Sequence, residues 1–76
     1  MDTYADFFRK RLTDLRLKKD VSEYQMSVEL GKSKGYIQQI TSGRSLPSMA
    51  MFFEICDYLK VSPLEFSMKR TKNQVL

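Results

Sequence analysis

The stretch from residue 22 to residue 44 decides the fold, and it reads SEYQMSVELGKSKGYIQQITSGR. Ser22, followed three residues later by Gln25, forms a capping box of the kind that begins a helix. Gly31 is suited to end that helix, because glycine adopts the left-handed conformation without strain. Ser33 can then cap another helix. The stretch therefore predicts two consecutive helices, over residues 23–30 and 33–41.

The rest of the chain adds three more helical segments. Near the start, apolar residues recur at helical spacing and predict a helix over residues 4–18. Pro47 and Ser48 open a fourth helix, whose apolar stripe is expected to anchor the core through Met49, Phe52, Phe53, Ile55, Cys56 and Leu59. Ser62-Pro63-Leu64-Glu65 combines a cap serine, a first-turn proline and a capping-box glutamate, which predicts a short helix to Phe66. Strand signals do not recur, so the expected fold class is all-α with five short helices.

The turn between the two central helices is about three residues long and contains Gly31, which is the spacing of a helix-turn-helix. At about 100° per residue, the inward face of helix 33–41 carries Ile37 and Ile40. An arc of roughly 140° on the other side carries Lys34, Gly35, Gln38, Gln39 and Ser42. A helix fits the major groove of double-stranded DNA, where lysine can donate to guanine and glutamine can bond the edge of adenine. This polar face is therefore a candidate for reading bases, and Gly35 would let the backbone approach them closely.

The distribution of charge favours the same surface. The formal net charge is only +4, but residues 30–46 hold three basic side chains and no acidic one. These are Lys32, Lys34 and Arg44. Polar side chains of the kind that bond phosphates and base edges lie among them, namely Ser33, Tyr36, Gln38, Gln39 and Ser42.

Size and composition argue against catalysis. A chain of 76 residues has little area left for an active-site cavity, and it contains no histidine and one cysteine. We therefore expect no enzyme activity, catalytic residue, metal site, cofactor or small-molecule ligand, and we expect Cys56 to be a buried hydrophobe. The longest apolar run, residues 49–53, is far shorter than the ~20 residues of a membrane helix. The expected location is the cytoplasm.

Together these residues resemble the Cro and phage-repressor type of helix-turn-helix, also called the xenobiotic-response-element family of bacterial and phage regulators. The resemblance covers about residues 8–66. It is carried by Leu12-Thr13-Asp14-Leu15-Arg16, Val21-Ser22, Leu30-Gly31-Lys32-Ser33, Ile37, Ile40, Ser42-Gly43-Arg44, Pro47-Ser48-Met49 and Leu59-Lys60-Val61-Ser62-Pro63-Leu64-Glu65-Phe66. It implies base-reading positions at Lys34, Gly35 and Gln39, with Gln38 beside them. It implies phosphate-facing positions at Ser33, Tyr36, Ser42 and Arg44.

The sequence departs from the family pattern at three positions. Glu23 stands where the family usually has a glutamine that touches phosphate. Lys32 replaces the usual apolar or threonine residue, and we assign it to a phosphate contact. Thr41 replaces a glutamate that commonly pairs with the arginine at the position of Arg16.

We expect residues 1–66 to form a DNA-binding domain and residues 67–76 a basic tail. The expected function is sequence-specific regulation of transcription, as a repressor. Symmetric half-sites favour a homodimer, and the resemblance suggests the last two helices and the tail as its contact surface. The alternative is an antitoxin-like or antirepressor-like interaction module with a helix-turn-helix fold and no DNA site of its own. Glu23 and the acidic segment 47–66 favour that alternative, whereas Lys34, Arg44 and the acid-free segment 30–46 oppose it.

Overall fold

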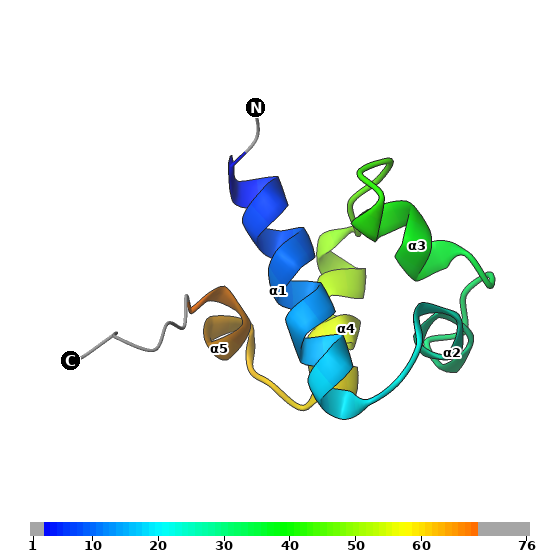
Figure 1. The fold of residues 1–76 in the computed structure, drawn as a ribbon. Helices are drawn as coiled ribbons and strands as arrows, with labels where there is room; N and C mark the ends of the chain where they lie inside the picture. Colours follow the sequence, from blue (N-terminus) through cyan, green and yellow to red (C-terminus); the bar gives the residue numbers. More distant parts are fainter. Residues whose placement is uncertain (1–2, 69–76) are drawn as a thin grey trace.

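The computed structural model describes residues 3–68 of the chain, and this part is built from five helices (Figure 1). They are α1 (Thr3–Lys19), α2 (Glu23–Glu29), α3 (Tyr36–Thr41), α4 (Met49–Leu59) and α5 (Pro63–Ser67). The predicted all-α class with five short helices is confirmed. The proposed tail, residues 67–76, lies outside the described residues except for Ser67 and Met68, so the division into a domain and a tail stays a prediction.

Serine side chains fix the starts of three helices. The hydroxyl oxygens of Ser22, Ser48 and Ser62 accept hydrogen bonds from backbone N–H groups three residues later, at 2.9, 3.2 and 3.0 Å. At α5 the capping box is complete, because Glu65 Oε1 also accepts from the N–H of Ser62 at 3.0 Å. At α2 the box is only half formed, since the side chain of Gln25 donates to Glu29 Oε2 at 3.1 Å instead.

The predicted start of the third helix is wrong. Residues 33–36 form a turn in which the N–H of Tyr36 donates to the carbonyl of Ser33 at 3.0 Å. The N-cap of α3 is Gly35, which has no side chain to make a capping hydrogen bond. The helix therefore covers 36–41 rather than 33–41, and Lys34 lies in the turn before it.

The core is assembled from one apolar face of each helix. Its buried members are Leu12, Leu15, Met26, Ile37, Ile40, Ile55, Cys56, Leu59 and Phe66. Phe52 is half-buried, and its ring lies 6.0 Å from that of Phe8 and 5.2 Å from that of Phe66. Cys56 is buried as expected, and this burial raises the pKa of its thiol.

The apolar stripe expected on the fourth helix needs one correction. Met49 and Phe53 are 67% and 52% exposed, whereas Met51 is buried. The inward face of α4 follows the four-residue spacing of Met51, Ile55 and Leu59, which stacks one residue per turn on the side facing the core. Met49 and Phe53 lie on the outer part of the same helix.

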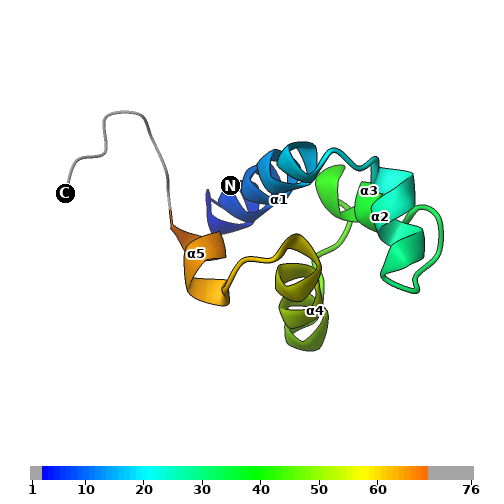
Figure 2. The ribbon, with the colours of Figure 1, turned by 90° about the horizontal axis from the view of Figure 1, so that it is seen from below.

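Two arginines of α1 hold the ends of other helices. Arg9 Nε donates to the carbonyl of Ile40 at 2.7 Å, in the last turn of α3. Arg11 Nε and Nη2 donate to the carbonyls of Phe66 and Glu65 at 2.9 and 2.8 Å, at the end of α5. Cations are favourable at helix C-termini, where carbonyl groups lack partners within the helix. Figures 1 and 2 show the result, with α1 running between α3 on one side and α5 on the other.

Candidate nucleic-acid interface

The turn between α2 and α3 has a well-defined backbone geometry. Gly31 adopts a left-handed conformation with φ of 77°. Its N–H donates to the carbonyl of Val28 at 2.9 Å, and the N–H of Lys32 donates to that of Ser27 at 3.0 Å. This pair of bonds is the Schellman motif that closes a helix. The left-handed glycine predicted at this position is confirmed.

Ser27 joins the two helices of the motif. Its side chain is fully buried, and Oγ donates to the carbonyl of Glu23 at 2.8 Å while accepting from the N–H of Ile37 at 2.9 Å. Because Gly35 cannot cap α3, this hydroxyl from α2 satisfies an N–H in the first turn of α3 instead. Ser27 was not among the residues predicted from the sequence to have a function. Its position next to the buried Met26, on the inward face of α2, could have indicated that its hydroxyl is buried and needs a partner.

The residues predicted to read bases are brought together on one exposed surface. Lys34, Gly35, Gln38 and Gln39 are all exposed, and Ile37 and Ile40 on the opposite side are fully buried. The N–H of Gln39 donates to the carbonyl of Gly35 at 2.9 Å, so these two residues lie one turn apart. We call the exposed residues Lys34, Gly35, Gln38, Gln39 and Ser42 the α3 ridge.

Of the residues assigned to phosphate contacts, all but one are exposed. Lys32, Ser33, Ser42 and Arg44 face solvent, and Lys32 Nζ lies 5.5 Å from the centre of the Tyr36 ring. Tyr36 is half-buried and packs against the core. Burial raises the pKa of Tyr36, and the negative charge of Glu54 raises it further. Its ring therefore contributes to packing, whatever its hydroxyl contacts.

A second polar contact joins α2 to the other end of α3. Thr41 Oγ1 donates to Glu23 Oε2 at 2.7 Å, and both side chains are half-buried. Arg16 instead donates from Nη1 to the carbonyl of Val21 at 2.8 Å. Its Nε is buried and has no hydrogen-bond partner among residues 3–68. A backbone carbonyl thus takes the place of the glutamate that commonly pairs with this arginine in the family, where this chain has Thr41.

The helix-turn-helix family model matches residues 12–66, which is more than two thirds of the chain. The chain belongs to this family, in its Cro and phage-repressor branch. No curated protein and no solved structure matches the chain. The matched segment runs from α1 through α5 and includes α2, the glycine turn and α3. The family is one of DNA-binding transcription regulators, and the match assigns the protein to that functional class. Members of the family are generally non-enzymatic.

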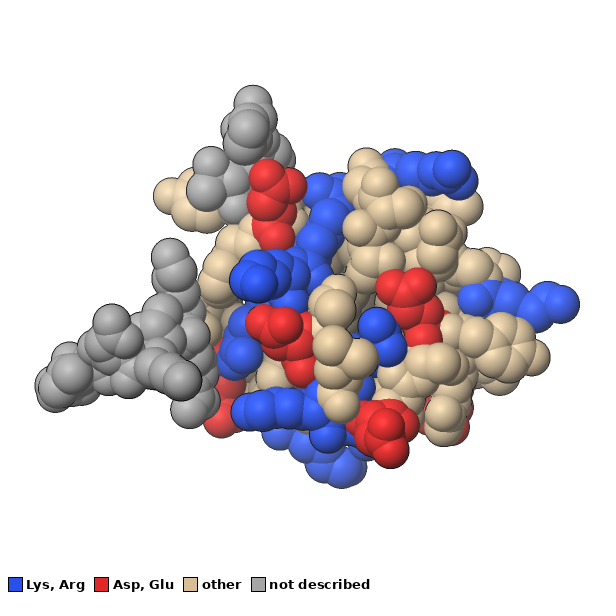
Figure 3. All heavy atoms as spheres, in the orientation of Figure 1, with Lys and Arg blue, Asp and Glu red and all other residues tan. Residues whose placement is uncertain are grey.

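The charged surface of this helix-turn-helix protein is mixed. Figure 3 shows lysine and arginine side chains spread along α1 with acidic side chains between them, and further basic side chains at the outer edge on the side of α2 and α3. Within the described part of the chain, no group of three or more His, Cys, Asp or Glu side chains could hold a metal ion. No helix among residues 3–68 is long and apolar enough to cross a membrane.

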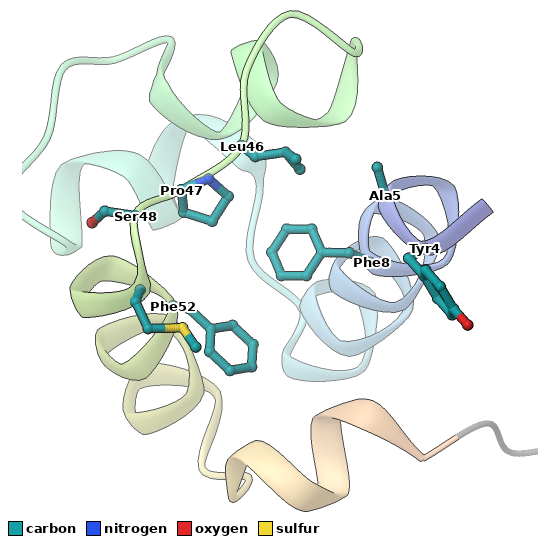
Figure 4. A pocket seen from close by; sticks show the side chains of 8 residues that line it. Tyr4, Ala5, Phe8, Leu46, Pro47, Ser48 and Phe52 are labelled. Atoms are coloured by element: carbon teal, nitrogen blue, oxygen red, sulfur yellow. The ribbon is translucent and has the colours of Figure 1, made fainter. Parts of the chain in front are cut away.

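A hollow of about 300 Å³ opens beside the first turns of α1 and α4 (Figure 4). It is bounded by the start of α1, the segment before α4 and the start of α4, and it is lined by Tyr4, Ala5, Phe8, Leu46, Pro47, Ser48, Met49 and Phe52. Its lining is almost entirely apolar, with two hydroxyl groups and no charged side chain. Such a lining is suited to contact with apolar groups.

Proposed function

We propose that this protein is a sequence-specific transcriptional repressor that binds operator DNA as a homodimer. In this proposal, α3 and the turn before it enter the major groove. A repressor of this kind acts by occupying its operator, so that DNA binding alone accounts for its effect.

The α3 ridge is the observation that carries the proposal. Five exposed residues lie opposite two fully buried isoleucines, so α3 is anchored on one side and free to meet a ligand on the other. Gln38 and Gln39 supply amides that can bond a base edge in a bidentate way, and Lys34 supplies a donor for guanine. Gly35 leaves open space where a side chain would stand, since an added Cβ there meets nothing within 4 Å.

Residues around the ridge are proposed to bind the DNA backbone. Lys32 and Arg44 offer charge, and Ser33 and Ser42 offer hydroxyl groups, all from exposed positions. Tyr36 is assigned to the same set through its hydroxyl only, because its ring packs against the core. Such contacts fix the register of a protein on DNA without specifying its sequence.

The homodimer is supported by the logic of DNA recognition and by exposed apolar side chains. Symmetric operators require two recognition helices about 34 Å apart, which one small domain cannot provide. Phe53 and Met49 on α4 and Leu64 on α5 are more than half exposed. Exposed apolar groups that gather on one part of a surface often mark a protein contact.

One observation favours the rival function, a protein-interaction module without its own operator. The carboxylate of Glu23 stands at the end of α3, next to the proposed DNA surface. A negative charge there opposes phosphate binding. The acid-free stretch of residues 30–46 weighs against the rival, because the segment that supplies the ridge contains no carboxylate of its own.

Selection from a random duplex pool distinguishes the two functions. A repressor should enrich a motif with two related half-sites and bind it ~10³–10⁷ times more tightly than random DNA. Binding no tighter than ~10⁻⁴ M at physiological salt, with no motif enriched, would replace the DNA proposal with the interaction module.

A further inference from the structure

Polar contacts hold α3 near both of its ends. In the first turn, the N–H of Ile37 donates to Ser27 Oγ at 2.9 Å, and at the last residue Thr41 Oγ1 donates to Glu23 Oε2 at 2.7 Å. Arg9 adds a bond from α1 to the carbonyl of Ile40 at 2.7 Å. Since α3 has only six residues, it is ~9 Å long, and contacts at its two ends determine its tilt.

The apolar contacts of α3 cannot fix its orientation alone. Ile37 and Ile40 bury it against the core, but hydrophobic burial has no preferred direction. Hydrogen bonds do have one, because they weaken steeply as donor and acceptor lose alignment. The bond between Thr41 and Glu23 joins a hydroxyl to a carboxylate, and bonds of this charge-assisted kind are stronger than neutral ones.

We infer that Thr41 and Glu23 are positioning residues for DNA recognition, whose hydrogen bond sets the angle at which α3 presents its ridge to the bases. The inference rests on the proposed function. Neither residue belongs to the α3 ridge, and both side chains are half-buried. Thr41 directly precedes Ser42, and Glu23 lies in the first turn of α2 with its carboxylate committed to Thr41. The pair acts on base reading through α3.

Replacing Thr41 by valine tests the pair while keeping its shape. Thr41→Val removes the donor and leaves a side chain of nearly the same volume. The ratio of affinities for the selected operator and for random duplex should fall about tenfold, since misplacing Gln38 and Gln39 weakens only base-specific contacts. Thr41→Ser keeps the hydroxyl and should restore the ratio. Thr13 is also a half-buried threonine, but it lies on α1. Thr13→Val is therefore the matched control and should leave the affinity ratio unchanged.

The partner is tested through a double-mutant cycle. Glu23→Ala should lower the same ratio, and the double variant Glu23→Ala with Thr41→Val should lower it no further, because both remove one interaction. Glu23→Gln keeps an oxygen that accepts from Thr41 and removes the negative charge. It should therefore preserve the ratio while raising affinity for operator and random DNA together.

Denaturant unfolding of each variant separates a positioning effect from a loss of the fold. We expect the affinity ratio to change in variants that are still folded at the assay temperature. The inference fails if Thr41→Val lowers affinity for operator and random DNA equally, or if the two substitutions act additively. A parent protein that enriches no motif overturns the proposed function and this inference together. A parent that enriches a motif, with an unchanged ratio in Thr41→Val, overturns the inference alone.

Discussion

Gln39 is the residue whose substitution best tests base reading. Its side chain is exposed one turn after Gly35, and it takes no part in the core. Gln39→Ala should leave stability nearly unchanged and cost ~1–3 kcal/mol of binding free energy on the preferred operator, with much less on random DNA. Preference should relax at one base pair of each half-site. Repeating the selection with the variant measures this, and an unaltered motif would remove Gln39 from the base-reading set.

Arg44 tests the backbone contacts in a different way. A phosphate contact carries no sequence information, so Arg44→Ala should weaken binding to all sequences about equally. The slope of log affinity against log salt should become shallower by ~1 for each arginine lost. Fluorescence anisotropy at several salt concentrations gives that slope. Lys10→Ala removes one charge from an exposed position on α1, and a slope that changes equally in this control would show only a general effect of charge.

At the scale of the helices, a contact between α4 and α2 gives the protein a defined pH dependence. Tyr58 Oη donates to Glu29 Oε1 at 2.5 Å, and Lys19 Nζ lies 5.0 Å from the centre of the Tyr58 ring. This hydrogen bond, followed by that from Gln25, lowers the pKa of Glu29 below its ordinary value of 4.5. Burial and then Glu29 raise the pKa of Tyr58 from 10.0 to about 12.

The two shifts predict losses of stability at opposite ends of the pH scale. The contribution of Glu29 is complete above pH 4.5 and is lost as pH falls through its lowered pKa. The contribution of Tyr58 is complete below pH 10.0 and is lost as pH rises towards about 12. Tyr58→Phe should therefore flatten the pH dependence of the unfolding free energy in both ranges. Urea titrations across pH measure this. Tyr24→Phe, at an exposed tyrosine of α2, should retain the parental curve.

The helices also show where reasoning from sequence succeeds. Ser22 and Ser62 were found as caps because their partners lie three residues away, and such local signals are complete in the sequence. The start of α3 was misplaced because Ser33 has the composition of a cap but sits in a turn. The N–H of Tyr36 donates to the backbone carbonyl of Ser33 rather than to its side chain, and the N–H of Ile37 is bound by Ser27, ten residues away along the chain.

The exposed residues of the candidate site could be predicted from the sequence, but the hydrogen bonds that hold α3 in place could not. Helical periodicity places Gln38 and Gln39 on the outer face of α3, and all members of the α3 ridge are exposed as expected, including Lys34 in the turn before the helix, although their roles remain predictions. The bonds that hold α3 in place could not be found in this way. Arg9 is 31 residues from Ile40, and Glu23 is 18 residues from Thr41. In the sequence, a polar helix residue that bonds a distant part of the chain cannot be distinguished from one that simply faces solvent.

At the scale of the whole molecule, α1 makes the fold a single unit. Arg9 binds the end of α3 and Arg11 binds the end of α5, while Leu12 and Leu15, which follow them on α1, enter the core. Helices α3 and α5 are thus attached to α1 on opposite sides (Figures 1 and 2). In a dimer that contacts through α4 and α5, the spacing of the two recognition helices would be set by this attachment.

Phe53 on α4 is the residue whose substitution best tests the proposed dimer contact. Phe53 is 52% exposed on α4, near Met49, and its loss should cost little folding free energy. Phe53→Asp should place a charge in the proposed contact between subunits, so the dissociation constant of the dimer should rise at least tenfold, or ~1.4 kcal/mol. Sedimentation equilibrium measures that constant. Operator binding should weaken as well, because one monomer reaches only one half-site.

A matched variant separates the dimer contact from a general effect of an added carboxylate. Leu17 on α1 is 60% exposed, close to the exposure of Phe53, and it lies outside the proposed contact. Leu17→Asp should therefore leave the dissociation constant of the dimer unchanged, and its DNA affinity should fall only by the amount that one negative charge accounts for. If the two variants dissociate equally, α4 does not form the dimer contact. If neither shows any self-association and the parent is also monomeric at micromolar concentration, pairing must occur on the operator, where the two half-sites bring the subunits together.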